Sequence, residues 1–92
     1  MLTMTLSTHT GAMQLALAGK VSVKALPEIR RFIRYGKQIH LRVSLDLSEV
    51  TLIDRQTAQF LTEQMERGVE LVNCPVYIMQ WILRDTTHEP DN

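Results

Sequence analysis

Residues 40–47 alternate strictly between polar and apolar side chains. Leu41, Val43, Leu45 and Leu47 are separated by polar residues at the even positions. Successive side chains of a strand point to opposite faces, so this pattern predicts a strand with one polar face. A doubly wound parallel sheet needs apolar residues on both faces. We therefore expect a sheet that helices cover on one side only.

The first third of the chain predicts a hairpin and then a helix. Residues 1–10 and 12–18 alternate more loosely on either side of Gly11, which is typical of two strands joined by a tight turn. Leu26, Ile29 and Ile33 then follow the spacing of one apolar helical stripe. We expect this helix to run from about residue 25 to residue 35 and to end at Gly36.

The next segment predicts a second helix after a short apolar run. Residues 50–53 are apolar or small, and they lead to Asp54, a residue type that caps helix N-termini well. The helix is expected over residues 55–67, with Ala58, Leu61 and Met65 facing inward. Gly68 is expected to end it.

The remaining residues complete a fold of the α/β class. Residues 69–72 predict a short strand, and Pro75 suits the first position of a last helix that reaches about residue 84. Strands connected through helices imply parallel, right-handed crossovers. We expect one domain over residues 1–85, with a small mixed sheet of about four strands, about three helices mainly on one face, and a polar tail over residues 86–92.

Composition excludes several classes of protein. The 92 residues contain ten Lys plus Arg and ten Asp plus Glu, so the chain lacks the cationic excess of most nucleic-acid binders. No apolar run is long enough to cross a membrane, so we do not expect a membrane-embedded protein. Cys74 is the single cysteine and cannot form an internal disulfide. A reducing, cytoplasmic location is therefore expected.

Motifs for catalysis or cofactor binding are missing or weak. The chain has no glycine-rich phosphate loop and no paired cysteines, and His9, His40 and His88 fall in different predicted elements. We expect no catalytic residue, no metal and no cofactor. The alternative is a small enzyme or ligand-binding domain that uses Cys74 as a nucleophile, or Asp46 and Asp54 as an acid–base pair.

Residues 43–81 resemble the STAS domain, which is named for sulfate transporters and anti-sigma factor antagonists. Asp46, Leu47, Ser48 and Val50 match the LDLS-type turn of the family, and Asp54 matches the aspartate that opens its central helix. Gly68 and residues 69–72 match the glycine and short strand that follow. The resemblance implies a mixed sheet with helices on one face, as the residue pattern also predicts.

The resemblance also implies a function. STAS domains are mostly non-enzymatic modules of bacterial regulation that dock on a partner protein, often an anti-sigma factor with a kinase-like ATPase fold. Transporter components and larger regulatory assemblies are the other partners that the family implies. Carried onto this chain, the docking residues are Ser48, Glu49, Asp54, Arg55, Gln56 and Thr57.

This chain departs from the family at the site of phosphorylation. A phosphate on the central helix breaks docking in the family, because it adds about two negative charges to a surface that must be desolvated. The acceptor lies two residues after the aspartate, and here that residue is Gln56, which cannot carry phosphate. We therefore expect no switch at this position. Thr57, one residue later, and Ser48 are the alternative acceptors.

The last predicted helix is apolar on nearly all sides. If Val76, Met79 and Leu83 face the sheet, four large residues are left less sheltered. These four are Tyr77, Ile78, Trp81 and Ile82. They either complete the core of a small domain or form an interface with a partner or with a second copy of the chain, since Trp and Tyr are effective interface residues.

Overall fold

The computed structural model describes residues 1–87, which form four strands, three α-helices and one short 3-10 turn. In chain order they are β1 (Leu2–His9), β2 (Ala12–Val21), the 3-10 turn η1 (Val23–Ala25), α1 (Leu26–Gln38), β3 (Arg42–Ile53), α2 (Arg55–Glu66), β4 (Glu70–Val72) and α3 (Val76–Thr87).

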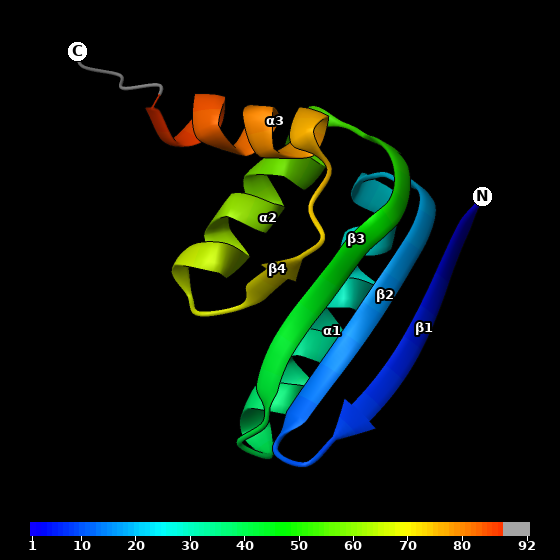
Figure 1. The fold of residues 1–92 in the computed structure, drawn as a ribbon, viewed down its shortest axis with the longest axis vertical. Coiled ribbons are helices and arrows are strands. Elements are labelled where there is room, and N and C mark those ends of the chain that lie inside the picture. Colours follow the sequence, from blue (N-terminus) through cyan, green and yellow to red (C-terminus); the bar gives the residue numbers. More distant parts are fainter. Residues whose placement is uncertain (88–92) are drawn as a thin grey trace.

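The strands form one mixed sheet in the order β1-β2-β3-β4. β1 and β2 pair antiparallel as a hairpin, whereas β2 with β3 and β3 with β4 pair parallel. α1 makes the first crossover and lies behind the sheet in Figure 1, and α2 and α3 lie against each other beside β3 and β4. The expected class, α/β with a small mixed sheet, is confirmed.

Burial along β2 and β3 shows that one face of the sheet carries the core. Leu15 lies opposite Leu45 in the register of the two strands, and both side chains are buried. Gln14 and Ser44 alternate with them, are only partly buried, and share a hydrogen bond on the other face. The alternation that predicted a one-sided sheet is therefore present in the structure.

β3 is one continuous strand, so the turn expected near Asp46 and Ser48 is wrong. The strand keeps its pairing with β2 by two register shifts, one between Ala16 and Ala18 and one between Gly19 and Lys20. The Asp46 carboxylate accepts a hydrogen bond from the backbone N–H of Ser48 at 3.0 Å. A local bulge therefore absorbs the irregularity without ending the strand.

Gly36 does not end α1, because it lies inside the helix and is buried against the sheet. A Cβ at this position would lie 2.6 Å from Val43 Cγ2, so glycine permits close approach of helix and strand. The helix ends instead at Gln38 with Ile39 as its C-cap, and His40 after it adopts a φ of 64°. The N–H of His40 bonds to the carbonyl of Lys37 and that of Leu41 to the carbonyl of Gly36, which is a Schellman motif.

α2 ends as the sequence predicts. Gly68 has a φ of 97°, and the N–H of Val69 bonds to the carbonyl of Gln64 in a second Schellman motif. Ala58 and Leu61 are buried as expected, but Met65 is exposed. Phe60 and Gln64 are buried together with Ala58 and Leu61, so the buried face of α2 is rotated from the predicted one.

α3 buries a different face from the one predicted. Ile78 and Ile82 are fully buried, whereas Val76 is 73% exposed and Leu83 is also exposed. The i, i+4 pair of isoleucines packs into the core, and Val76 lies a half-turn away from it. Of the two alternatives open for these residues, Ile78 and Ile82 therefore belong to the core.

α3 also continues to Thr87, into the segment expected to be a tail, and the rest of that tail lies outside the described residues. None of the helices in residues 1–87 has the length and hydropathy needed to cross a bilayer.

Candidate functional site: a surface at the start of α2

Asp54 connects the start of α2 to the loop after β2. Its Oδ1 accepts a hydrogen bond from the backbone N–H of Thr57 at 2.8 Å, as an N-cap residue does. Its Oδ2 accepts a second bond from the backbone N–H of Val23 at 3.1 Å, across 31 positions of sequence. The carboxylate therefore fixes two segments of backbone relative to each other.

The hydrogen bonds to Asp54 also set its charge. Partial desolvation raises the pKa of this carboxyl, but the bonds from Thr57 and from the backbone N–H of Val23 outweigh it and hold the pKa below its usual value. Asp54 is therefore ionised at neutral pH and acts as a fixed acceptor.

Exposed polar and apolar side chains surround Asp54. Arg55 and Gln56, the first two residues of α2, are exposed. Two large hydrophobic residues, Val23 and Leu52, are also exposed. The N–H of Val23 bonds to Asp54, and Leu52 lies two residues before Asp54. We call the set of Val23, Leu52, Asp54, Arg55 and Gln56 the α2-start surface.

Val23 and Leu52 are not among the site residues that the sequence predicts. Leu52 belongs to an apolar run that is typical of core residues. It is exposed because the alternation of buried and exposed residues is interrupted within β3. Val23 comes from a segment about 30 residues earlier, and no sequence pattern connects it to Asp54. The backbone hydrogen bond that joins them becomes visible only in the folded chain.

Thr57 lies in the core, so its expected place on the docking surface is wrong. The side chain is 1% exposed, and its hydroxyl donates to the carbonyl of Val21 at 3.3 Å. A residue one position after Gln56 is rotated by about 100° around the helix, and in α2 that rotation points it at the sheet. The Thr57 hydroxyl is inaccessible to a kinase in this conformation.

Ser48 and Glu49 are exposed but lie apart from the α2-start surface. Both belong to β3, and Ser48 is six residues before Asp54 on a continuous strand. Six residues of strand span up to about 20 Å, so Ser48 lies well away from Asp54, whereas Glu49 is three residues, about 10 Å, from Leu52. A docking partner must be broad to touch both Ser48 and Asp54.

Two of the predicted interface residues on α3 remain accessible. Trp81 is 38% exposed and Tyr77 is similarly placed at the border between buried and exposed. The Tyr77 hydroxyl donates to the carbonyl of Val50 at 2.8 Å, which holds the start of α3 against β3. Tyr77 therefore has a structural contact, whereas Trp81 is partly exposed and has no such bond among the described residues.

The arrangement gives no support to the enzymatic alternative. Burial raises the pKa of the Cys74 thiol, whereas a nucleophilic cysteine needs a lowered one. The Asp46 carboxylate accepts a bond from the backbone N–H of Ser48, which lowers the pKa of this carboxyl against partial desolvation. Asp46 lies eight residues before Asp54 on an extended strand, so the two carboxyls do not form a close pair.

No group of three His, Cys, Asp or Glu side chains in residues 1–87 is placed to hold a metal ion. His9 and His40 lie at the ends of different elements, and His88 lies outside the described residues.

Comparison with known proteins supports the fold at low sequence identity. No protein-family model matches the chain, and no curated protein matches it. Its structure is similar to that of the anti-sigma factor antagonist SpoIIAA in its unphosphorylated form, with a TM-score of 0.71 and 15% sequence identity. The match covers 89% of this chain and 83% of that one. The chain therefore has the fold of an anti-sigma factor antagonist.

Proposed function

We propose that this chain is a non-enzymatic regulatory module of the cytoplasm that docks on a protein partner through the α2-start surface. The observation that carries the proposal is the shared fold with SpoIIAA, which is an anti-sigma factor antagonist. The partner is an anti-sigma factor with a kinase-like ATPase fold, or else a component of a transporter or a larger regulatory assembly.

The chemistry of the α2-start surface suits docking better than catalysis. It combines two exposed apolar side chains, Val23 and Leu52, with the donors and acceptors of Arg55 and Gln56. An apolar centre next to hydrogen-bonding groups is common in protein interfaces. Asp54 fixes the backbone beneath them, so little conformational freedom is lost on binding.

Docking at this surface is not controlled by phosphate at the usual position. Gln56 occupies that position and cannot be phosphorylated, and Thr57 is buried behind it. Of the two alternative acceptors, Ser48 is exposed and therefore has the accessible hydroxyl. We propose that the module binds its partner without a switch at the start of α2.

The proposal is tested by changing the charge of the α2-start surface. Gln56→Glu places a negative charge where a phosphate would lie, and we expect it to lower recovery of the partner in a quantitative pull-down by about tenfold. Gln14→Glu makes the same chemical change on the open face of the sheet and keeps an acceptor for the Ser44 hydroxyl. It is expected to bind like the wild type.

Two results decide the outcome. Loss of a kinase-like ATPase or transporter component with Gln56→Glu, and its retention with Gln14→Glu, supports docking at the α2-start surface. Equal recovery with both variants contradicts it while leaving the fold untouched. Mass spectrometry of the same samples reports whether Ser48 carries phosphate.

A second candidate function is self-association through α3. Val76 is the most exposed large hydrophobic residue of that helix, and Trp81 is partly exposed on the same helix. Burying these side chains against a second copy would stabilise a dimer, because exposed apolar groups of this size favour association.

A further inference from the structure

A groove between α1 and α2 is lined by cations. Arg30, Arg34 and Lys37 contribute from α1 and Arg67 from the end of α2, and Gln64 lies between them. We call these five residues the cationic groove. Arg30, Arg34 and Lys37 follow the i, i+4, i+7 spacing of one helix face, so their charges form a row about 10 Å long.

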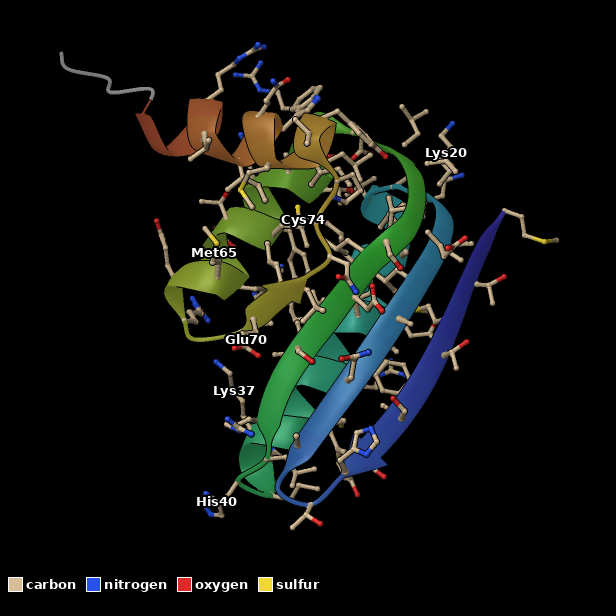
Figure 2. All side chains as sticks on the ribbon, in the orientation of Figure 1. Lys20, Lys37, His40, Met65, Glu70 and Cys74 are labelled. Atoms are coloured by element: carbon tan, nitrogen blue, oxygen red, sulfur yellow. The ribbon has the colours of Figure 1, made fainter. Side chains whose placement is uncertain are left out.

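The lining of the cationic groove contains no carboxylate, so positive charge is concentrated there. Within residues 1–87 none of its four cations forms an ion pair. Arg30 instead lies over the ring of Phe60, 4.9 Å from the centroid. The Lys37 ammonium donates to the carbonyl of Arg67 at 2.8 Å, and Figure 2 shows Lys37 extending from the side of the molecule near which α2 ends.

These contacts hold two of the four cations, Arg30 and Lys37, in place. Stacking on a buried ring fixes the Arg30 guanidinium, and the bond to a carbonyl keeps Lys37 across the groove from α1 to the end of α2. Four like charges gathered in one groove repel one another and destabilise the folded chain. Such an arrangement is favourable when an anion occupies the groove.

Gln64 gives an independent indication of a ligand. Its side chain is 3% exposed, yet its amide makes no hydrogen bond to any residue that the structure describes. A buried polar group without a partner costs about 1–3 kcal/mol. Because Gln64 lines the groove, a polar ligand bound there can supply the missing bonds.

We propose that the cationic groove binds an acidic, extended segment of a partner protein. Alternate side chains of an extended chain lie on one side at intervals of about 7 Å, so three of them span about 14 Å, against about 10 Å for the row on α1. The long side chains of Arg and Lys can spread to cover this difference. A segment with carboxylates at alternate positions can therefore pair with Arg30, Arg34 and Lys37 in turn, and its backbone can bond to the Gln64 amide.

Other anions fit the groove less well. A single-stranded nucleic acid binds by stacking on exposed aromatic rings, but Phe60, the ring beside the groove, is buried. A phosphate group prefers the N-terminus of a helix, whereas α2 presents its C-terminal carbonyls here. A membrane surface is flat, and these cations line a groove.

This surface is separate from the α2-start surface and does not depend on it. Gln64 and Arg67 lie at the last turn and C-cap of α2, about 15 Å from Gln56 along the helix. A partner that docks on both surfaces would contact α2 at its two ends. The two proposals can also fail separately.

The test measures binding of a labelled peptide of alternating Glu and Ser to the full chain by fluorescence anisotropy. Arg34→Glu reverses one charge in the groove, and we expect it to weaken binding by about tenfold or more. Arg31→Glu makes the same change at an exposed position of α1 outside the groove and is expected to weaken binding by less than about threefold. Gln56→Glu is expected to have no effect.

Several outcomes would overturn the proposal. Equal losses with Arg34→Glu and Arg31→Glu indicate unspecific attraction, and binding of a Gln-Ser peptide equal to that of the Glu-Ser peptide excludes recognition of carboxylates. Displacement of the labelled peptide by inorganic phosphate at a concentration similar to that of the peptide indicates a site for small anions. Arg34-dependent binding to phosphatidylserine vesicles without peptide binding indicates a membrane surface. Gln64→Leu, which changes no charge, should also weaken the peptide complex.

Discussion

Asp54 shows how one side chain can determine the geometry of a surface. Its two oxygens accept backbone N–H groups from α2 and from the segment after β2, which are brought together from distant parts of the sequence. A carboxylate can do this because both of its oxygens are acceptors, whereas an amide has one acceptor and one donor. The negative charge also interacts favourably with the helix N-terminus.

Replacing Asp54 by Asn tests this double role. The Asn oxygen can cap α2, but its NH₂ group then faces the N–H of Val23, and one donor loses its acceptor. We expect Asp54→Asn to lower the free energy of unfolding at pH 7 by about 1 kcal/mol, measured by urea denaturation. Glu63→Gln, a change at an exposed position of the same helix, should stay within about 0.5 kcal/mol of the wild type.

The stability difference between the wild type and Asp54→Asn should depend on pH. The pKa of Asp54 is lowered on folding, so its contribution to stability is complete above the pKa of the unfolded chain and is lost as pH falls through the lower, folded value. The wild type should therefore lose stability below about pH 4, and Asp54→Asn should lose less. A wild-type curve parallel to that of Asp54→Asn down to pH 2 would contradict this account.

Single residues also mark where sequence analysis fails. Asp54 as an N-cap and Gly68 as a helix end were predictable, because the signals are local. Gly36 was misread, because its role is to admit Val43 from a neighbouring strand. Thr57 was assigned to the surface from a family motif, while its burial depends on which face of α2 meets the sheet.

At the scale of whole elements, α3 has two apolar sides that behave differently. Ile78 and Ile82 are fully buried and belong to the core, while Val76 is largely exposed. Composition cannot separate these roles, since all three residues are apolar and β-branched. The packing of α3 against α2 determines which side is buried.

A matched pair of truncations separates the two sides of α3. Ile78→Ala removes a buried side chain and should lower the free energy of unfolding by about 2–5 kcal/mol. Val76→Ala removes an exposed one and should change it by less than about 0.5 kcal/mol. Equal effects in urea denaturation would show that α3 packs in a different orientation.

Elements were predicted well where the pattern was periodic and poorly at their boundaries. The alternation in residues 40–47 identified β3, and the apolar stripe at Leu26, Ile29 and Ile33 identified α1. The bulge that keeps β3 continuous past Ser48 had no sequence signal, because it depends on pairing with β2. The mixed, partly parallel sheet followed from the connections between elements, and its one-sided cover followed from the alternation in residues 40–47.

At the scale of the whole molecule, the oligomeric state tests the second candidate function. If α3 mediates self-association, the mass measured by light scattering should fall toward 10.6 kDa on dilution by about a hundredfold. Val76→Glu should then remove the larger species, because it places a charge in the apolar contact. Gln80→Glu, at an exposed position of the same helix, serves as the control.

A monomer at every concentration, with or without the charge at position 76, would exclude the second candidate. It would leave the α2-start surface as the site through which the chain acts. A dimer that survives Val76→Glu would indicate that copies meet through a surface other than α3.

The topology of the sheet has a kinetic consequence. The β1–β2 hairpin joins neighbouring segments, and hairpins of this kind close in microseconds. The centre of the sheet pairs β2 with β3, where Gln14 and Ser44 meet across 30 residues that include α1. Such non-local parallel pairing is slow, because the chain loses entropy before the contact is made. The refolding rate should therefore depend on how readily α1 forms and carries β3 back to its neighbour.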